Sequence, residues 1–139
     1  MSYQWDIEEY FRILKSGCRI EDSRLSTKAR LQRLIAIKSI IAFKILYLSK
    51  VALSNPTEVC TTILSQDEWR VLYIREHKTN KLPDKPPNIK EAIIWLGKLG
   101  GFMNRKCDGL PGSMTLWRGY ENLKESLIML SILDNTTCG

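Results

Sequence analysis

Histidine is almost absent from this sequence of 139 residues, because His77 is the only one. A single histidine excludes a zinc site built on paired His ligands, and no Gly-x-Ser-x-Gly segment supplies the nucleophile turn of a serine hydrolase. The four cysteines, Cys18, Cys60, Cys107 and Cys138, include no Cys-x-x-Cys pair. The sequence therefore predicts reduced thiols in a cytoplasmic protein, with neither a metal cage nor a disulfide framework.

An uninterrupted apolar run of membrane-spanning length is also lacking. Residues 34–53 have the length of a span, but Lys38, Lys44 and Lys50 interrupt them. A lysine near the centre of a bilayer costs roughly 2.5–3.5 kcal/mol on insertion scales. The first residues are polar and do not read as a signal peptide. We therefore expect a buried helix over 34–53 and no membrane partner.

Positive charge exceeds negative charge, with 21 Lys and Arg against 15 Asp and Glu, for a formal net charge of +6. Residues 12–38 hold a cluster of basic side chains with only Glu21 and Asp22 among them. Such a patch favours contact with phosphate. It equally fits a solvated helix face, so the charge alone leaves both interpretations open.

Apolar periodicity and capping signals predict an all-α helical bundle. Residues 6–15 place Ile7, Tyr10, Phe11 and Leu14 on one apolar stripe. Further helices are expected from Ser23 to about Leu53, from Thr57 through Leu64, after a capping box at Ser65–Glu68, after Asn88, and from Thr115 to residue 133. Residues 78–88 and 104–113 are predicted loops, and the tail from Asp134 is expected to fray. The tryptophans are expected in the core, at positions Trp5, Trp69, Trp95 and Trp117.

The first predicted helix carries a family resemblance. Residues 5–22, WDIEEYFRILKSGCRIED, resemble the segment around the last acidic residue of DDE-type cut-and-paste transposases of the insertion-sequence-four and Tn-five class. That family's signature is Tyr, two residues, Arg, three residues, Glu, six residues, Lys. Glu8 and Lys15 match its last two positions, whereas Met1 and Gln4 stand where its Tyr and Arg belong.

A second block, near the other end of the chain, resembles the C-terminal dimerisation region of the same family. It comprises residues 99–103, LGGFM, and 109–120, GLPGSMTLWRGY, followed by Glu121 and Leu123. The resemblance implies that residues 1–22 are the C-terminal remnant of an RNase H-like catalytic domain, whose helix carries the catalytic Glu. It implies that residues 23–139 form a helical C-terminal, dimerisation domain.

The resemblance also implies roles for individual residues. Glu8 is the expected catalytic residue and metal ligand, but only in a complete DDE site, where three carboxylates hold two Mg²⁺ ions. Lys15, Arg12 and Arg19 are the expected contacts to the DNA of the transposon ends. The two Asp residues that precede the Glu in the family have no counterpart in this chain, so we expect no cofactor and no catalysis from the chain alone.

Self-association is the remaining implication, and the last predicted helix is its best candidate. The expected partners are a second copy or a full-length transposase, and no small-molecule substrate. The predicted dimerisation residues are Leu116, Tyr120, Leu123, Leu127 and Leu130.

Several interpretations of such a chain remain open from the sequence. It is a decayed fragment, or a part whose catalytic half is encoded separately, or a self-association module that inhibits a full-length transposase. A small basic DNA-binding regulator is the alternative from another class. We also expect the helix over 6–15 to dock loosely, because its apolar stripe would pack on a sheet that this chain lacks.

Overall fold

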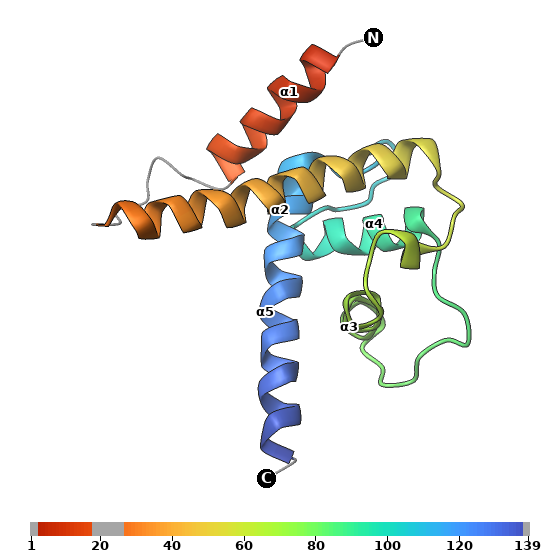
Figure 1. Ribbon diagram of the computed structural model, residues 1–139. Helices are drawn as coiled ribbons and strands as arrows, with labels where there is room; N and C mark the ends of the chain where they lie inside the picture. The colour runs from red at the N-terminus through yellow and green to blue at the C-terminus, as the bar shows by residue number, and fades with distance from the viewer. Residues whose placement is uncertain (1–2, 18–26, 138–139) are drawn as a thin grey trace.

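The computed structural model describes residues 3–17 and 27–137, and all regular structure within these ranges is helical. The predicted all-α fold is therefore confirmed (Figure 1). The elements are α1 (Tyr3–Arg12), the π-helical turn η1 (Ile13–Gly17), α2 (Lys28–Ser54), the 3-10 turn η3 (Cys60–Thr62), α3 (Gln66–His77), α4 (Ile89–Leu99) and α5 (Ser113–Thr137). The predicted domain boundary between residues 22 and 23 lies outside the described residues.

The ends of α2 differ in how well the sequence predicts them. The helix begins at Lys28 with Thr27 as its N-cap residue, and the predicted cap, Ser23, lies outside the described residues. The helix ends at Ser54, directly before Asn55-Pro56, as predicted. Among the described helices none is long and apolar enough to cross a membrane.

The helix predicted from Thr57 through Leu64 is wrong, because only the 3-10 turn η3 forms there. Backbone bonds to the start of α4 prevent a longer helix. The Cys60 N–H donates to the carbonyl of Pro87 at 3.0 Å, and the Ile89 N–H donates to the carbonyl of Glu58 at 2.8 Å. These bonds hold the segment extended before η3, where a helix would need the same groups internally.

Two predicted N-caps are confirmed as capping boxes. At α3 the Glu68 N–H donates to Ser65 Oγ at 3.2 Å, and the Ser65 N–H donates back to Glu68 Oε2 at 2.8 Å. At α4 Asn88 and Glu91 make the same reciprocal pair, at 2.8 and 3.2 Å. Each pair satisfies backbone donors that a helix start otherwise leaves without partners.

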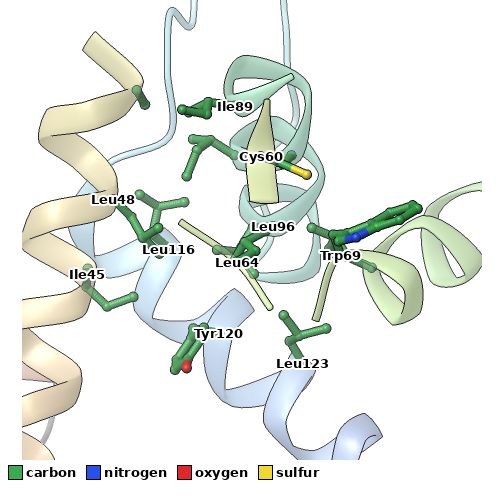
Figure 2. Close-up of a cluster of buried hydrophobic side chains, with 14 of the residues drawn as sticks. Ile45, Leu48, Cys60, Leu64, Trp69, Ile89, Leu96, Leu116, Tyr120 and Leu123 are labelled. Carbon is green, nitrogen blue, oxygen red and sulfur yellow. The ribbon is translucent and has the colours of Figure 1, made fainter. Parts of the chain in front are cut away.

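The core lies where α2, α3, α4 and α5 meet, and Figure 2 shows its side chains converging from these helices. Trp69 and Trp117 are buried there and Trp95 is partly buried, as predicted. Fully buried members from the four helices include Ile45, Leu48, Leu72, Ile89, Leu96, Leu116 and Leu123.

Helix α1 is turned differently from the prediction. Tyr10 and Leu14 pack against the core and the Tyr10 hydroxyl donates to the Ser39 carbonyl at 3.3 Å, but Ile7 and Phe11 are 55% and 50% exposed. Ile13 at the start of η1 is fully buried in their place. Helix α1 contacts α2 near both of its ends, because Asp6 pairs with Lys50 and the Tyr10 hydroxyl bonds to Ser39. In this orientation Ile7 and Phe11 face away from the bundle.

Trp5 is a second correction at this end of the chain, because it is 54% exposed and not a core residue. Its ring lies beside Lys50, whose Nζ is 4.6 Å from the ring centroid. The indole lines a small cavity together with Ile93 and Leu116, but the core does not enclose it.

Helix α5 begins at Ser113, two residues before the predicted start, and continues through Thr137. The expected fraying from Asp134 is wrong within the described residues, because the helix includes Asp134–Thr137. In Figure 1 the first turns of α5 lie against α2 and α4, and its second half projects away from the bundle.

Candidate functional site

Helix α1 and the following turn η1 hold three of the residues predicted to act on DNA or metal. Glu8, Arg12 and Lys15 are all exposed. Arg12 is engaged by a neighbour, since its Nε and Nη2 donate to the two carboxylate oxygens of Glu9 at 3.0 and 2.6 Å. Arg19 lies outside the described residues.

Asp6 and Glu9 are carboxylates of α1 that contact other helices, through Lys50 and Ser113 respectively. The Arg12 guanidinium lowers the pKa of Glu9 below its ordinary value, against the opposing effect of burial. Ser113 Oγ, at the start of α5, donates to Glu9 Oε1 at 2.6 Å. Glu9 therefore ties α1 to α5, a role that the sequence does not signal because its partner lies 104 residues away.

No group of three or more His, Cys, Asp and Glu side chains that could hold a metal ion occurs within 3–17 and 27–137. Glu8 stands on α1 and Lys15 on η1, both facing solvent. The catalytic, metal-binding and DNA-binding roles of these residues stay predictions.

The five predicted dimerisation residues divide between the core and the surface. Leu116, Tyr120 and Leu123 are buried in the core of the chain itself, because the first half of α5 completes the bundle. Leu127 is partly buried against that core, and Leu130 is 41% exposed. In this fold only the last of the five offers a large surface to a partner.

A broad apolar surface lies on the projecting half of α5 instead. Its members face different sides of the helix, and each is between 41% and 62% exposed. The residues are Ile128, Met129, Leu130, Ile132 and Leu133, which we call the α5 tail surface. Several large exposed apolar side chains on one short stretch of helix mark an interaction site more often than isolated exposed leucines do.

A buried polar cluster fixes the direction in which α5 leaves the bundle. Glu68 on α3 accepts hydrogen bonds at Oε1 from Lys44 Nζ on α2, at 2.9 Å, and from the Tyr120 hydroxyl on α5, at 3.0 Å. Burial raises the pKa of Glu68, but the bonds from Lys44 and the Ser65 N–H outweigh it and hold the pKa below its ordinary value. The sequence signals Glu68 only as part of a capping box.

The helical bundle matches a known protein family. Residues 40–129, more than half of the chain, match the family model described as the transposase Tn5 dimerisation domain. The match begins within α2 and ends within α5, and so covers every residue of the buried core except Ile13.

Proposed function

Because this chain belongs to the family of Tn5 transposase dimerisation domains, we propose that it acts by self-association, as the C-terminal part of a DDE-type transposase. The single observation that supports this proposal is the exposure of the five apolar side chains of the α5 tail surface. The buried half of α5 positions this surface, and the projecting half presents it.

The size of the α5 tail surface fits a reversible dimer. Full burial of a side chain of this size contributes about 1.5–3 kcal/mol. Five such side chains on each copy, each with roughly half of its area left to bury, supply on the order of 10 kcal/mol. Association costs about 4–15 kcal/mol, so we infer a dimer whose population depends on concentration.

Light scattering over a dilution series of the full chain tests this proposal. We expect a dimer that dissociates on dilution. The Ile132→Asp variant should be monomeric, because it places a charge within the α5 tail surface. Ser131→Asp is the matched control, because it places the same charge on the neighbouring exposed residue outside the apolar set. A monomer at every concentration of the unaltered chain refutes the proposal.

We further propose that residues 1–22 belong to an RNase H-like catalytic domain. The exposure of Ile7 and Phe11 supports this, since apolar side chains in the middle of a helix usually pack on something. Glu8 would then hold Mg²⁺ and Lys15 would contact the transposon-end DNA only beside the two missing carboxylates. The chain alone should show no metal-dependent nicking of a transposon-end duplex, and nicking would overturn this proposal.

A mixed dimer with a full-length transposase is a second candidate function in a cytoplasmic setting. The α5 tail surface supports it, because a surface that pairs two copies also pairs one copy with a longer relative. Adding the chain to an active transposase should lower its strand-transfer yield, and adding the Ile132→Asp variant should not.

A further inference from the structure

A small cavity lies between the start of α1 and the bundle. Its volume is about 170 Å³, and Trp5 is the residue of α1 that lines it. Ile93 of α4 and Leu116 of α5, both buried, lie on its other walls together with residues at the end of α2. Because Trp5 is 54% exposed, its indole borders an unfilled space on one side and solvent on the other. We call this space the Trp5 cavity, and we call residues Tyr3–Arg12 the α1 arm.

Apolar contact contributes little to the docking of the α1 arm. A side chain beside an unfilled space loses dispersion contacts on that side, because protein interiors are otherwise densely packed. This applies to Trp5, and Ile7 and Phe11 face away from the bundle. Among the large apolar side chains of the arm, Tyr10 packs against the core.

Charged side chains supply further contacts of the arm. Asp6 forms an ion pair with Lys50 of α2, and Lys50 Nζ also lies 4.6 Å from the centroid of the Trp5 ring. The side chains of Asp6 and Lys50 are 39% and 44% exposed, so dissolved ions can reach both. Glu9 accepts a hydrogen bond from Ser113 Oγ of α5 at 2.6 Å. The closed position of the arm therefore depends on charges that respond to ionic strength.

The chain is anchored directly after the arm, at η1. Ile13, the first residue of this turn, is fully buried, and Leu14 packs against the core. The turn contacts both α2 and α5. Turns with π-helical hydrogen bonding are rare and occur frequently at functional sites. The arm can therefore move about η1 while Ile13 stays in the core.

We propose that the α1 arm is a hinged cover of the Trp5 cavity. Contacts to Lys50 and Ser113 hold the arm closed, and it opens about η1 when salt weakens them. Opening lets water reach Ile93 and Leu116, whereas the core of α2, α3, α4 and α5 stays folded. Ionic strength then controls access to an apolar space between α2, α4 and α5. This inference does not depend on the proposed self-association, because the movement occurs within one chain.

Salt distinguishes an arm held by charge from an arm held by apolar contact. Raising sodium chloride from about 0.01 M to about 1 M shortens the Debye length from about 30 Å to about 3 Å. An exposed ion pair changes an equilibrium by a factor of up to about five, so we expect the open fraction to rise about threefold or more over this range. Apolar contacts are not screened, and an arm held by them would not open.

Fluorine NMR of a fluorotryptophan-labelled chain measures the opening. The chain has four tryptophans, and the Trp5→Phe variant identifies the resonance of Trp5. The difference in chemical shift between light and heavy water reports how far solvent reaches each ring. We expect this difference to grow with salt at Trp5 and to stay constant at Trp69 and Trp117, which are 4% and 3% exposed. The response should be the same at every protein concentration.

Lys50→Gln is the variant that tests the charge contacts. It removes both the ion pair and the cation beside the indole, so Trp5 should be more exposed at low salt and should respond less to added salt. Lys28→Gln is the matched control, because it removes the same charge from the exposed first residue of α2. Its response to salt should equal that of the unaltered chain.

Each contrary outcome overturns the proposal. A Trp5 resonance that does not respond to salt shows that charge does not hold the arm. A response of all four tryptophans together shows that salt unfolds the bundle. A Lys28→Gln chain that behaves as Lys50→Gln does shows an effect of net charge alone. A response that depends on protein concentration shows self-association in place of hinge opening.

The methyl resonances of Ile13 locate the hinge. Ile13 stays buried when the arm turns about η1, so its methyl shifts should not change over the salt range in which Trp5 opens. The Ile13→Val variant identifies these resonances. Methyl shifts that move together with the Trp5 resonance would show that η1 leaves the core with the arm, and the hinge proposed here would be wrong.

Discussion

Gly100 and Gly119 face each other where α4 and α5 cross, and neither position has room for a side chain. A Cβ atom at Gly119 would lie 1.9 Å from the backbone oxygen of Leu96, and one at Gly100 would lie 1.9 Å from the backbone oxygen of Thr115. The two helices therefore touch backbone to backbone at this point. This contact holds the first half of α5 in the bundle, and so determines where its second half projects.

We predict that Gly119→Ala destabilises the fold despite the better helix propensity of alanine. The added methyl meets rigid backbone, so the helices must separate, and overpacking of this kind costs about 1–3 kcal/mol. Urea unfolding followed by circular dichroism measures the loss. Arg118→Ala, an exposed change on the next residue, is the control and should leave stability nearly unchanged. An equally stable Gly119→Ala chain would mean that α4 and α5 do not touch backbone to backbone at this crossing.

The Glu68 cluster predicts a pH dependence of stability. The folded-state pKa of Glu68 is lowered, so its contribution is fully present above the ordinary value of 4.5 and is lost as the pH falls through the folded value. Glu68→Gln should therefore cost about 1–3 kcal/mol at pH 7, and progressively less as the pH falls below about 4.5.

Unfolding midpoints of the Glu68→Gln and unaltered chains, measured between pH 3 and pH 7 (roughly the range over which a carboxyl titrates), test this dependence. Glu125→Gln is the control, because that carboxylate is exposed and should behave as the unaltered chain does. A constant difference across the whole range would show that the charge of Glu68 does not matter.

Local signals explain why the helices of the bundle were predictable. The capping boxes at Ser65 and Asn88 and the stop at Asn55-Pro56 each depend on residues within one turn of the chain. The missing helix at Thr57–Leu64 depends instead on backbone bonds to Pro87 and Ile89, which no local pattern reveals.

The candidate site was less predictable for the same reason. Apolar spacing places Leu116, Tyr120 and Leu123 on one face of α5, but it does not say whether that face meets its own chain or a partner. The structure assigns it to the chain's own core, through Gly119 and Glu68. The α5 tail surface can be identified only once the first half of α5 is known to be buried in the chain's own core.

Amide hydrogen exchange should show that α1 is the least protected helix joined to the bundle. Its apolar anchor is Tyr10, next to Ile13 and Leu14 of η1, whereas Ile7 and Phe11 contribute exposed surface. Its polar ties, from Asp6 to Lys50 and from Glu9 to Ser113, involve partly exposed side chains. We expect residues 7–12 to exchange through local opening, well before residues 45–48 of α2, which exchange only on global unfolding. Strong protection across residues 6–15 would contradict the loose docking that we predict.

DNA binding by the α1 face should depend on Lys15 more than on Arg12. Glu9 already accepts two hydrogen bonds from Arg12, so a phosphate must compete with that carboxylate for the guanidinium. If the face binds DNA, Lys15→Ala should weaken binding and lower the slope of log K against log salt by about 1, and Arg12→Ala should do less. Lys85→Ala, in the distant 78–88 loop, is the control.

The comparison of Arg12 with Lys15 also tests the role of Glu9. Glu9→Gln should release Arg12 and strengthen salt-sensitive binding, because it removes a competing negative charge as well as a partner. The same change should loosen the start of α5 from α1, since Ser113 loses a charged acceptor. Binding that is equally sensitive to Arg12→Ala and Lys15→Ala, and indifferent to Glu9→Gln, would place the phosphate contact on another face of the molecule.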